Sequence, residues 1–230
     1  MKKYYHFTEI PDLDLEVLKE KTLHFFNTTK ERLDAEFLIF NWHNFNRAVP
    51  ELGEALGKWG YTIVQYGAFV MRTKNHAPPH RDDTIIPIRL NIPICNTEHT
   101  WTSFFENNDA SRRNDKPENI PSLHKINNGL RSIPYKNQDI HMVDRMQLTS
   151  PAWIRPMEIH SVICEEGFRM PRIALTLALD PLPYELFPDI PSDDRPKWQD
   201  LCNLNGWHEP IFHGTVHSEY TKYIPNYNHG

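Results

Sequence analysis

The sequence predicts a mainly β protein with helices on its N-terminal side. Two helix-like segments precede roughly seven or eight short strand-like runs, and turn residues separate those runs. No helical pattern alternates with the strands, so a parallel sheet built from βαβ units is not expected. The 19 prolines also favour short strands and fixed turns over a helical bundle. A double-sheet jelly roll fits these observations.

The N-terminal part, residues 1–60, carries both predicted helices. In residues 12–30 leucines and phenylalanines fall near one face, and acidic residues occupy the first turn, where they complement the helix dipole. In residues 49–60 Pro50 suits a first helical position, apolar residues recur at helical spacing, and Gly60 ends the pattern. We expect both helices to pack against a sheet.

Residues 61–181 carry the strand-like runs and are expected to form the jelly-roll core. In the run 87–95, Arg89 and Asn91 share one face, while leucine and isoleucine side chains share the other. In the run 172–180 one face is small, with Arg172 at its end, and the other is bulky. The small face leaves room for a ligand inside the fold, and the bulky face can pack against the helices.

Two segments lie outside this core pattern. A polar and locally basic insertion at about residues 107–139 fits a lid, a partly disordered loop, or a substrate-facing loop that recognises an acidic group. Residues 182–230 form a proline-rich C-terminal extension, with one short helix near residues 196–205 and aromatic side chains suited to packing or to contacts in an oligomer. We expect a single domain over residues 1–230.

Composition narrows the class of protein. The net charge of −5 disfavours a nucleic-acid partner, because such proteins usually carry a basic excess. Three cysteines without a CxxC pair fit reduced thiols better than a disulfide framework. The polar, acidic N-terminus lacks the apolar core of a signal peptide, and no apolar run has the length of a membrane span. The expected location is therefore the cytoplasm.

One stretch combines metal-ligating residues at the mouth of a strand. His80 and Asp82 stand two positions apart, so in an extended segment both side chains point to the same side. His160, from the strand-rich C-terminal half, can supply a third ligand. Two histidines and one carboxylate are the ligand set typical of non-haem iron(II) sites with open coordination positions. Asp83 is the alternative carboxylate, but the period-2 geometry of a strand favours Asp82.

An arginine follows the second histidine at a short offset. Arg172 lies twelve residues beyond His160, at the start of a strand-like run. Its planar guanidinium is suited to bidentate contact with a carboxylate. Arg169 is the competing cation, although it belongs to a looser segment.

This ordered set resembles the iron(II)- and 2-oxoglutarate-dependent oxygenases. Residues 80–94, "HRDDTIIPIRLNIPI", and residues 160–180, "HSVICEEGFRMPRIALTLALD", resemble in particular the aspartyl/asparaginyl β-hydroxylase-type branch. The resemblance covers about residues 60–181. Some members of that branch lack the carboxylate ligand, whereas this chain has Asp82.

The resemblance implies a cupin-like double-stranded β-helix and three requirements: iron(II), 2-oxoglutarate as cosubstrate and molecular oxygen. It implies that His80, Asp82 and His160 bind the iron, and that Arg172 holds the distal carboxylate of 2-oxoglutarate. Arg89 matches a second cosubstrate-binding arginine of the branch, and Asn91 is its neighbour on the same face.

The reaction it implies is hydroxylation of an unactivated carbon, coupled to decarboxylation of 2-oxoglutarate to succinate. The substrate is an amino acid, another small molecule, or an aspartyl or asparaginyl side chain of a peptide or protein. Two alternatives stay open: a cupin-type metal enzyme that does not use 2-oxoglutarate, and a non-catalytic jelly-roll binding module.

Overall fold

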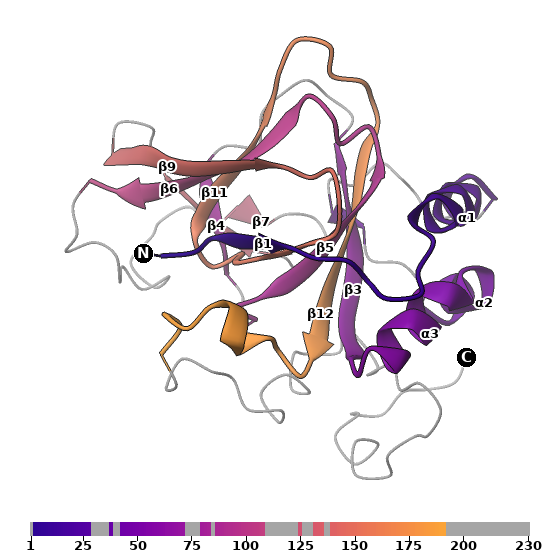
Figure 1. The fold of residues 1–230 in the computed structure, drawn as a ribbon. Coiled ribbons are helices and arrows are strands. Elements are labelled where there is room, and N and C mark those ends of the chain that lie inside the picture. The colour runs from indigo at the N-terminus through magenta and orange to yellow at the C-terminus, as the bar shows by residue number, and fades with distance from the viewer. Residues whose placement is uncertain are drawn as a thin grey trace.

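The fold is a pair of antiparallel sheets with helices to one side, in a computed structural model that describes residues 2–28, 37–38, 42–71, 79–83, 86–108, 124–125, 131–135 and 139–191. Each sheet has six strands. The helices gather beside β3 and β12, away from β6 and β9 (Figure 1). The prediction of a mainly β protein with N-terminal helices is confirmed.

The two sheets are built from the following strands. Sheet one lies next to the helices, and its strands run in the order β1 (Tyr5–Phe7), β10 (Ala152–Ile154), β5 (Arg89–Cys95), β12 (Arg172–Asp180), β3 (Thr62–Met71) and β2 (Phe37–Leu38). Sheet two has the order β7 (His124–Lys125), β8 (Arg131–Pro134), β4 (His80–Asp83), β11 (Ile159–Cys164), β6 (Thr100–Asn107) and β9 (Ile140–Gln147).

Eight of these strands pair in a nested order. Along the chain they are β3, β4, β5, β6, β9, β10, β11 and β12. The first of the eight pairs with the last, the second with the seventh, the third with the sixth and the fourth with the fifth. Residues far apart in the sequence therefore become neighbours, and β4 is placed against β11.

Three helices precede this core: α1 (Leu15–Thr28), α2 (Trp42–Ala48) and α3 (Pro50–Lys58). Asp14 caps α1, because its Oδ1 accepts hydrogen bonds from the N–H groups of Glu16 at 2.9 Å and Val17 at 3.1 Å. Pro50 begins α3, as predicted.

The sequence-based prediction was incomplete in this N-terminal part. It treated residues 1–60 as helical and missed α2 and the short strands β1 and β2. These elements have seven, three and two residues. Stretches so short carry too few periods for an apolar pattern to identify them.

Strand β12 separates two layers, as its alternating pattern predicts. Leu175 and Leu177 belong to the large core cluster that also contains residues of all three helices. Ala174 faces the other way and packs near Phe104 of β6, between the sheets. The bulky face of β12 is thus buried under the helices, and its small face looks toward sheet two.

Much of the predicted insertion and of the C-terminal extension lies outside the described residues. Within residues 107–139 the structure describes β7 and β8, and β8 extends sheet two by pairing with β4. After β12 a short 3-10 helix, η4 (Tyr184–Leu186), follows. The helix predicted near residues 196–205 lies beyond the described part. None of the described helices has the length and apolar character to cross a membrane.

Candidate active site

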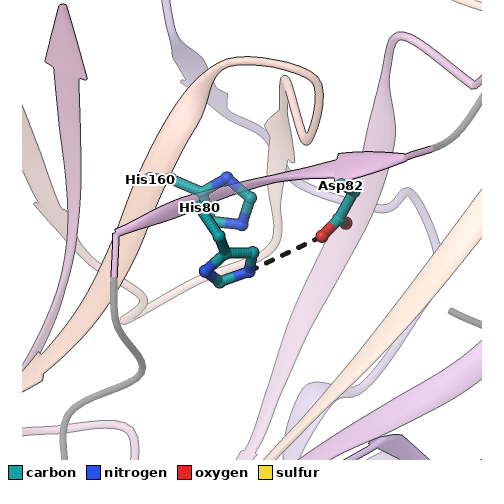
Figure 2. Close-up of side chains that lie close together, drawn as sticks. All are labelled: His80, Asp82 and His160. Carbon is teal, nitrogen blue, oxygen red and sulfur yellow. Dashed lines mark ion pairs between the residues drawn. The ribbon is translucent and has the colours of Figure 1, made fainter. Parts of the chain in front are cut away.

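Three metal-ligating side chains meet where β4 pairs with β11. His80 and His160 are directly opposite each other in the antiparallel register, and Asp82 follows two residues along β4. One ligand atom from each residue lies within 4.8 Å of the other two. Figure 2 shows the His80 and Asp82 side chains on the same side of their strand, with the His160 ring beside the His80 ring. The structure thus brings together the three residues predicted as ligands.

The protonation state of His160 suits a metal ligand. Its Nδ1 lies 2.8 Å from the carbonyl oxygen of Glu158, so Nδ1 carries the proton and Nε2 keeps its lone pair. The side chain is 7% exposed. Burial, aided by the neighbouring His80, lowers the pKa of His160 to about 4. The imidazole is therefore neutral at neutral pH, which is the form that binds a metal.

Asp82 is a buried carboxylate with an unsatisfied oxygen. The residue is 4% exposed, and its Oδ1 has no hydrogen-bond partner in the described part of the structure. The group nearest to that oxygen among the described ion pairs is His80 Nε2, at 3.6 Å. A buried charge is costly unless it is paired or coordinates a metal. A divalent cation between these groups would satisfy Asp82, so the residues present fit a metal ion. The side chain of the alternative ligand, Asp83, lies outside the described residues.

Arg172 is a buried cation at one end of the inner face of β12. It is 4% exposed, and its Nε donates a hydrogen bond to Thr100 Oγ1 at 3.0 Å. Burial lowers its pKa to about 10, so the guanidinium stays charged at neutral pH. No carboxylate among the described residues pairs with it. Its competitor Arg169 is exposed, in the segment before β12.

Arg89 and Asn91 occupy the inner face of β5, as predicted from its alternation. Arg89 is buried and close enough to Asp82 for the two charges to interact; burial lowers its pKa to about 10, and Asp82 opposes this shift. Asn91 lies opposite Thr176 of β12. Asn91 Oδ1 and Thr176 Oγ1 are both buried without a hydrogen-bond partner in the described structure. They are polar groups available to a bound molecule.

The two buried arginines lie toward opposite ends of the same sheet. In the register of β5 with β12, Arg172 comes next to Ile173, which pairs with Cys95, whereas Arg89 is six residues earlier on β5. Six residues of strand span about 20 Å. Arg89 lies at the Asp82 end and Arg172 at the Thr100 end, so the two guanidiniums belong to different parts of the inner face.

Sequence reasoning missed two groups that orient site residues. The Glu158 carbonyl fixes the tautomer of His160, and a backbone group leaves no signature in a sequence. Thr100 begins β6 on the same face as Phe104, and its hydroxyl lies beside the start of β12, where it accepts the hydrogen bond from Arg172 Nε. The alternation of side chains along β6 could be predicted from the sequence, but the contact between Thr100 and Arg172 could not.

Comparisons with known proteins add the following. No protein-family model matches the sequence, and no curated protein matches it. Among solved structures, AviO1 from Streptomyces viridochromogenes Tue57 is similar with 10% identity and a TM-score of 0.43, over 78% of this chain and 91% of that one. The epimerase SnoN, in a complex with Fe3+, alpha ketoglutarate and nogalamycin RO, is similar with 10% identity and a TM-score of 0.43, over 77% of this chain and 79% of that one. Similarity this low supports no assignment of activity, which has to come from the side chains of the chain itself.

Proposed function

We propose that the protein is an iron(II)- and 2-oxoglutarate-dependent dioxygenase that hydroxylates an unactivated carbon. The observation that carries this proposal is the group of His80, Asp82 and His160, in which a buried carboxylate oxygen lacks any hydrogen-bond partner in the described structure. Arg172 adds a buried cation with no described carboxylate to pair with.

The strand pairing supports the fold that this function needs. In a jelly roll eight strands form two sheets through two Greek keys. The nested pairing of β3 with β12, β4 with β11, β5 with β10 and β6 with β9 is the pairing of such a double-stranded β-helix. In this interpretation the eight strands form a single oxygenase domain.

The three ligands would leave half of the metal's coordination positions open. Two imidazoles and one carboxylate suit iron(II) and would leave room for a chelating cosubstrate and for oxygen. The metal supplies the redox chemistry when it is bound, and the chain supplies binding and orientation. Glu158 contributes by holding the His160 ring through its carbonyl, so that Nε2 faces the other two ligands.

The inner face of sheet one would bind 2-oxoglutarate between the proposed metal ligands and Arg172. Arg172 would hold the distal carboxylate in bidentate contact, with its guanidinium oriented by Thr100. Arg89, at the Asp82 end, would neutralise the charge near the metal. Asn91 and Thr176 lie between them and offer hydrogen bonds. The small side chain of Ala174 leaves space on the same face.

We assign the substrate to the amino-acid class, either a free amino acid or an aspartyl or asparaginyl side chain of a peptide or protein. This assignment rests on the resemblance of residues 80–94 and 160–180 to the aspartyl/asparaginyl β-hydroxylase-type branch. A small molecule or a protein is thus the proposed partner, and the cytoplasm is the proposed location.

The proposal is tested by adding iron(II) and 2-oxoglutarate to the protein without oxygen. We expect the weak visible charge-transfer absorption of the iron chelate, and its loss in the double variant His80→Ala, Asp82→Ala. A matched control is His141→Ala, which removes an exposed histidine of β9 outside the ligand group. Absence of the band in the unaltered protein, or its survival in the double variant, contradicts the proposal.

Succinate release then separates the proposal from the two alternatives. A screen of amino acids and peptides in air should find at least one that stimulates release of succinate. A cupin-type enzyme that does not use 2-oxoglutarate would bind the metal without forming succinate. A non-catalytic module would do neither.

A further inference from the structure

The turn between β10 and β11 makes backbone contact with two of the three candidate ligands. The Pro156 carbonyl accepts a hydrogen bond from the backbone N–H of Asp82 at 2.9 Å. The Glu158 carbonyl accepts one from Nδ1 of His160 at 2.8 Å. The path of residues 155–158 therefore sets both the position of β4 at Asp82 and the orientation of the His160 ring.

The side chain of Arg155 holds this turn through ion pairs and a hydrogen bond. Its Nη2 lies 2.8 Å from Oε1 of Glu158, three residues further along the turn. Its Nη1 donates to the Lys3 carbonyl at 3.2 Å and to Oδ2 of Asp189 at 2.5 Å. The same guanidinium thus contacts the N-terminal segment, the turn and the segment after η4.

Burial and further contacts strengthen the ion pair between Arg155 and Glu158. Arg155 is only 8% exposed, so solvent screens its ion pairs weakly. Glu158 is held on its other oxygen as well, because Lys2 Nζ lies 2.5 Å from Oε2. The backbone N–H of Arg155 donates to the Tyr4 carbonyl at 3.2 Å, which ties the turn to β1. The planar guanidinium of arginine has several N–H donors and can therefore contact three partners at once. The single ammonium group of a lysine cannot reproduce this arrangement.

We propose that Arg155 is a positioning residue for the metal site and acts through the carbonyls of Pro156 and Glu158. This inference rests on the proposed function, since it takes His80, Asp82 and His160 to be the metal ligands. Without the guanidinium, the Glu158 side chain loses its partner in the turn, and of the described contacts there only the backbone hydrogen bond from Glu158 N–H to the Arg155 carbonyl remains, so the Glu158 carbonyl holds the His160 ring less firmly. Partners of this kind affect metal affinity even though they never touch the ion.

The test uses Co(II) as a spectroscopic probe in the full chain. Arg155→Gln should weaken Co(II) binding roughly tenfold, at the lower end of the loss usual for residues that orient metal ligands. It should also alter the visible ligand-field spectrum of the bound ion, which lost stability alone does not change. Arg155→Lys should restore only part of the affinity. The matched control is Arg145→Gln, which loses an ion pair to Glu165 and a stacking contact with Trp101 but touches no part of the turn.

Each result separates this inference from the proposed function. If the unaltered protein binds no Co(II), the proposed metal site is wrong and this inference fails with it. If the unaltered protein binds Co(II) and Arg155→Gln binds it with the same affinity and spectrum, only the role of Arg155 is wrong. If Arg155→Gln does not fold, Asp189→Asn replaces it, because Asp189 is exposed and its loss removes a single partner of the guanidinium. We expect a several-fold loss of affinity there, and an unchanged affinity overturns the inference.

Discussion

His80 and His160 lie side by side across β4 and β11, with ring centroids 4.5 Å apart and ring planes inclined by 50°. Two imidazoles this close can both be neutral, but two positive charges would repel each other. This closeness places the two imidazoles within reach of one cation in the proposed site.

Metal binding should stabilise the protein, and Asp82 should be required for this effect. At a metal concentration of 100 times Kd the free energy of unfolding rises by about 2.7 kcal/mol, because the ion binds only the folded chain. Asp82→Asn keeps the shape of the side chain but removes the charge, so most of this gain should vanish. Thermal unfolding with and without Co(II) measures it. Asp144→Asn, on β9, is the control, and an equal loss in the control contradicts the prediction.

The stability of the metal-free protein should fall as the pH decreases from about 6.5 to about 4. His160 has a pKa near 4 in the folded chain, whereas an unfolded histidine titrates near its ordinary value of 6.5. Between these values the unfolded chain binds the extra proton, so acid favours unfolding, by at most about 1.4 kcal/mol for each pH unit. Urea unfolding across this range should show a flatter profile for His160→Gln. Identical profiles would mean that His160 is not buried in its neutral form.

Removal of the Arg172 guanidinium should weaken 2-oxoglutarate binding without affecting the metal. Hydrogen bonds to charged groups contribute about 1.5 to 3 kcal/mol, so Arg172→Met should raise the Kd for 2-oxoglutarate roughly 10- to 100-fold. Calorimetric titration in the presence of Mn(II) measures this constant. Arg169→Met changes an exposed arginine nearby and should have no effect. The opposite pattern would transfer the carboxylate contact to Arg169.

Thr100→Val should also weaken 2-oxoglutarate binding, but less than Arg172→Met does. The substitution keeps the shape of the side chain but removes the oxygen that accepts a hydrogen bond from Arg172 Nε. This hydrogen bond orients the guanidinium but does not itself contact the anion, so its loss should cost only about 0.5 to 1.5 kcal/mol of binding, and the Kd for 2-oxoglutarate should rise about three- to tenfold. In a double-mutant cycle with Arg172→Met the two effects should not add. Full additivity would show that Thr100 does not act through Arg172.

Leu175→Ala should damage the fold but not the site. Leu175 is fully buried in the cluster beneath the helices, and its neighbour Ala174 faces the other layer. A cavity at such a position costs about 2 to 5 kcal/mol, measurable by urea unfolding. The Co(II) affinity of the folded fraction should be unchanged. A large loss of Co(II) affinity would show that the two layers are not independent.

The faces of the core strands and the pairing of His80 with Asp82 were predictable because they depend on short-range alternation. Arg89 and Asn91 on β5, and Arg172 on β12, take their face from period-2 spacing alone. The same rule chose Asp82 as the partner of His80 on β4. Patterns of this kind survive folding because a slip of one residue would expose a whole apolar face.

What could not be predicted depends on pairing between distant strands or on backbone groups. Residues 152–164 divide into β10 and β11, which belong to different sheets. The turn between them then supplies two carbonyls to the site. Likewise, no local pattern showed that Thr100 would meet Arg172, because β6 reaches β12 only through the packing of the two sheets.

The nested strand order has a consequence for how the chain is made. Arg172 pairs with Met71, about 100 residues earlier, and His160 pairs with His80 across a comparable interval. During synthesis His80 and Asp82 emerge from the ribosome well before β11, the strand that carries His160. In the proposed site, iron that meets the nascent chain before His160 emerges would find only two of the three donors. The nested strand order therefore delays completion of the proposed site until β11 has been synthesised.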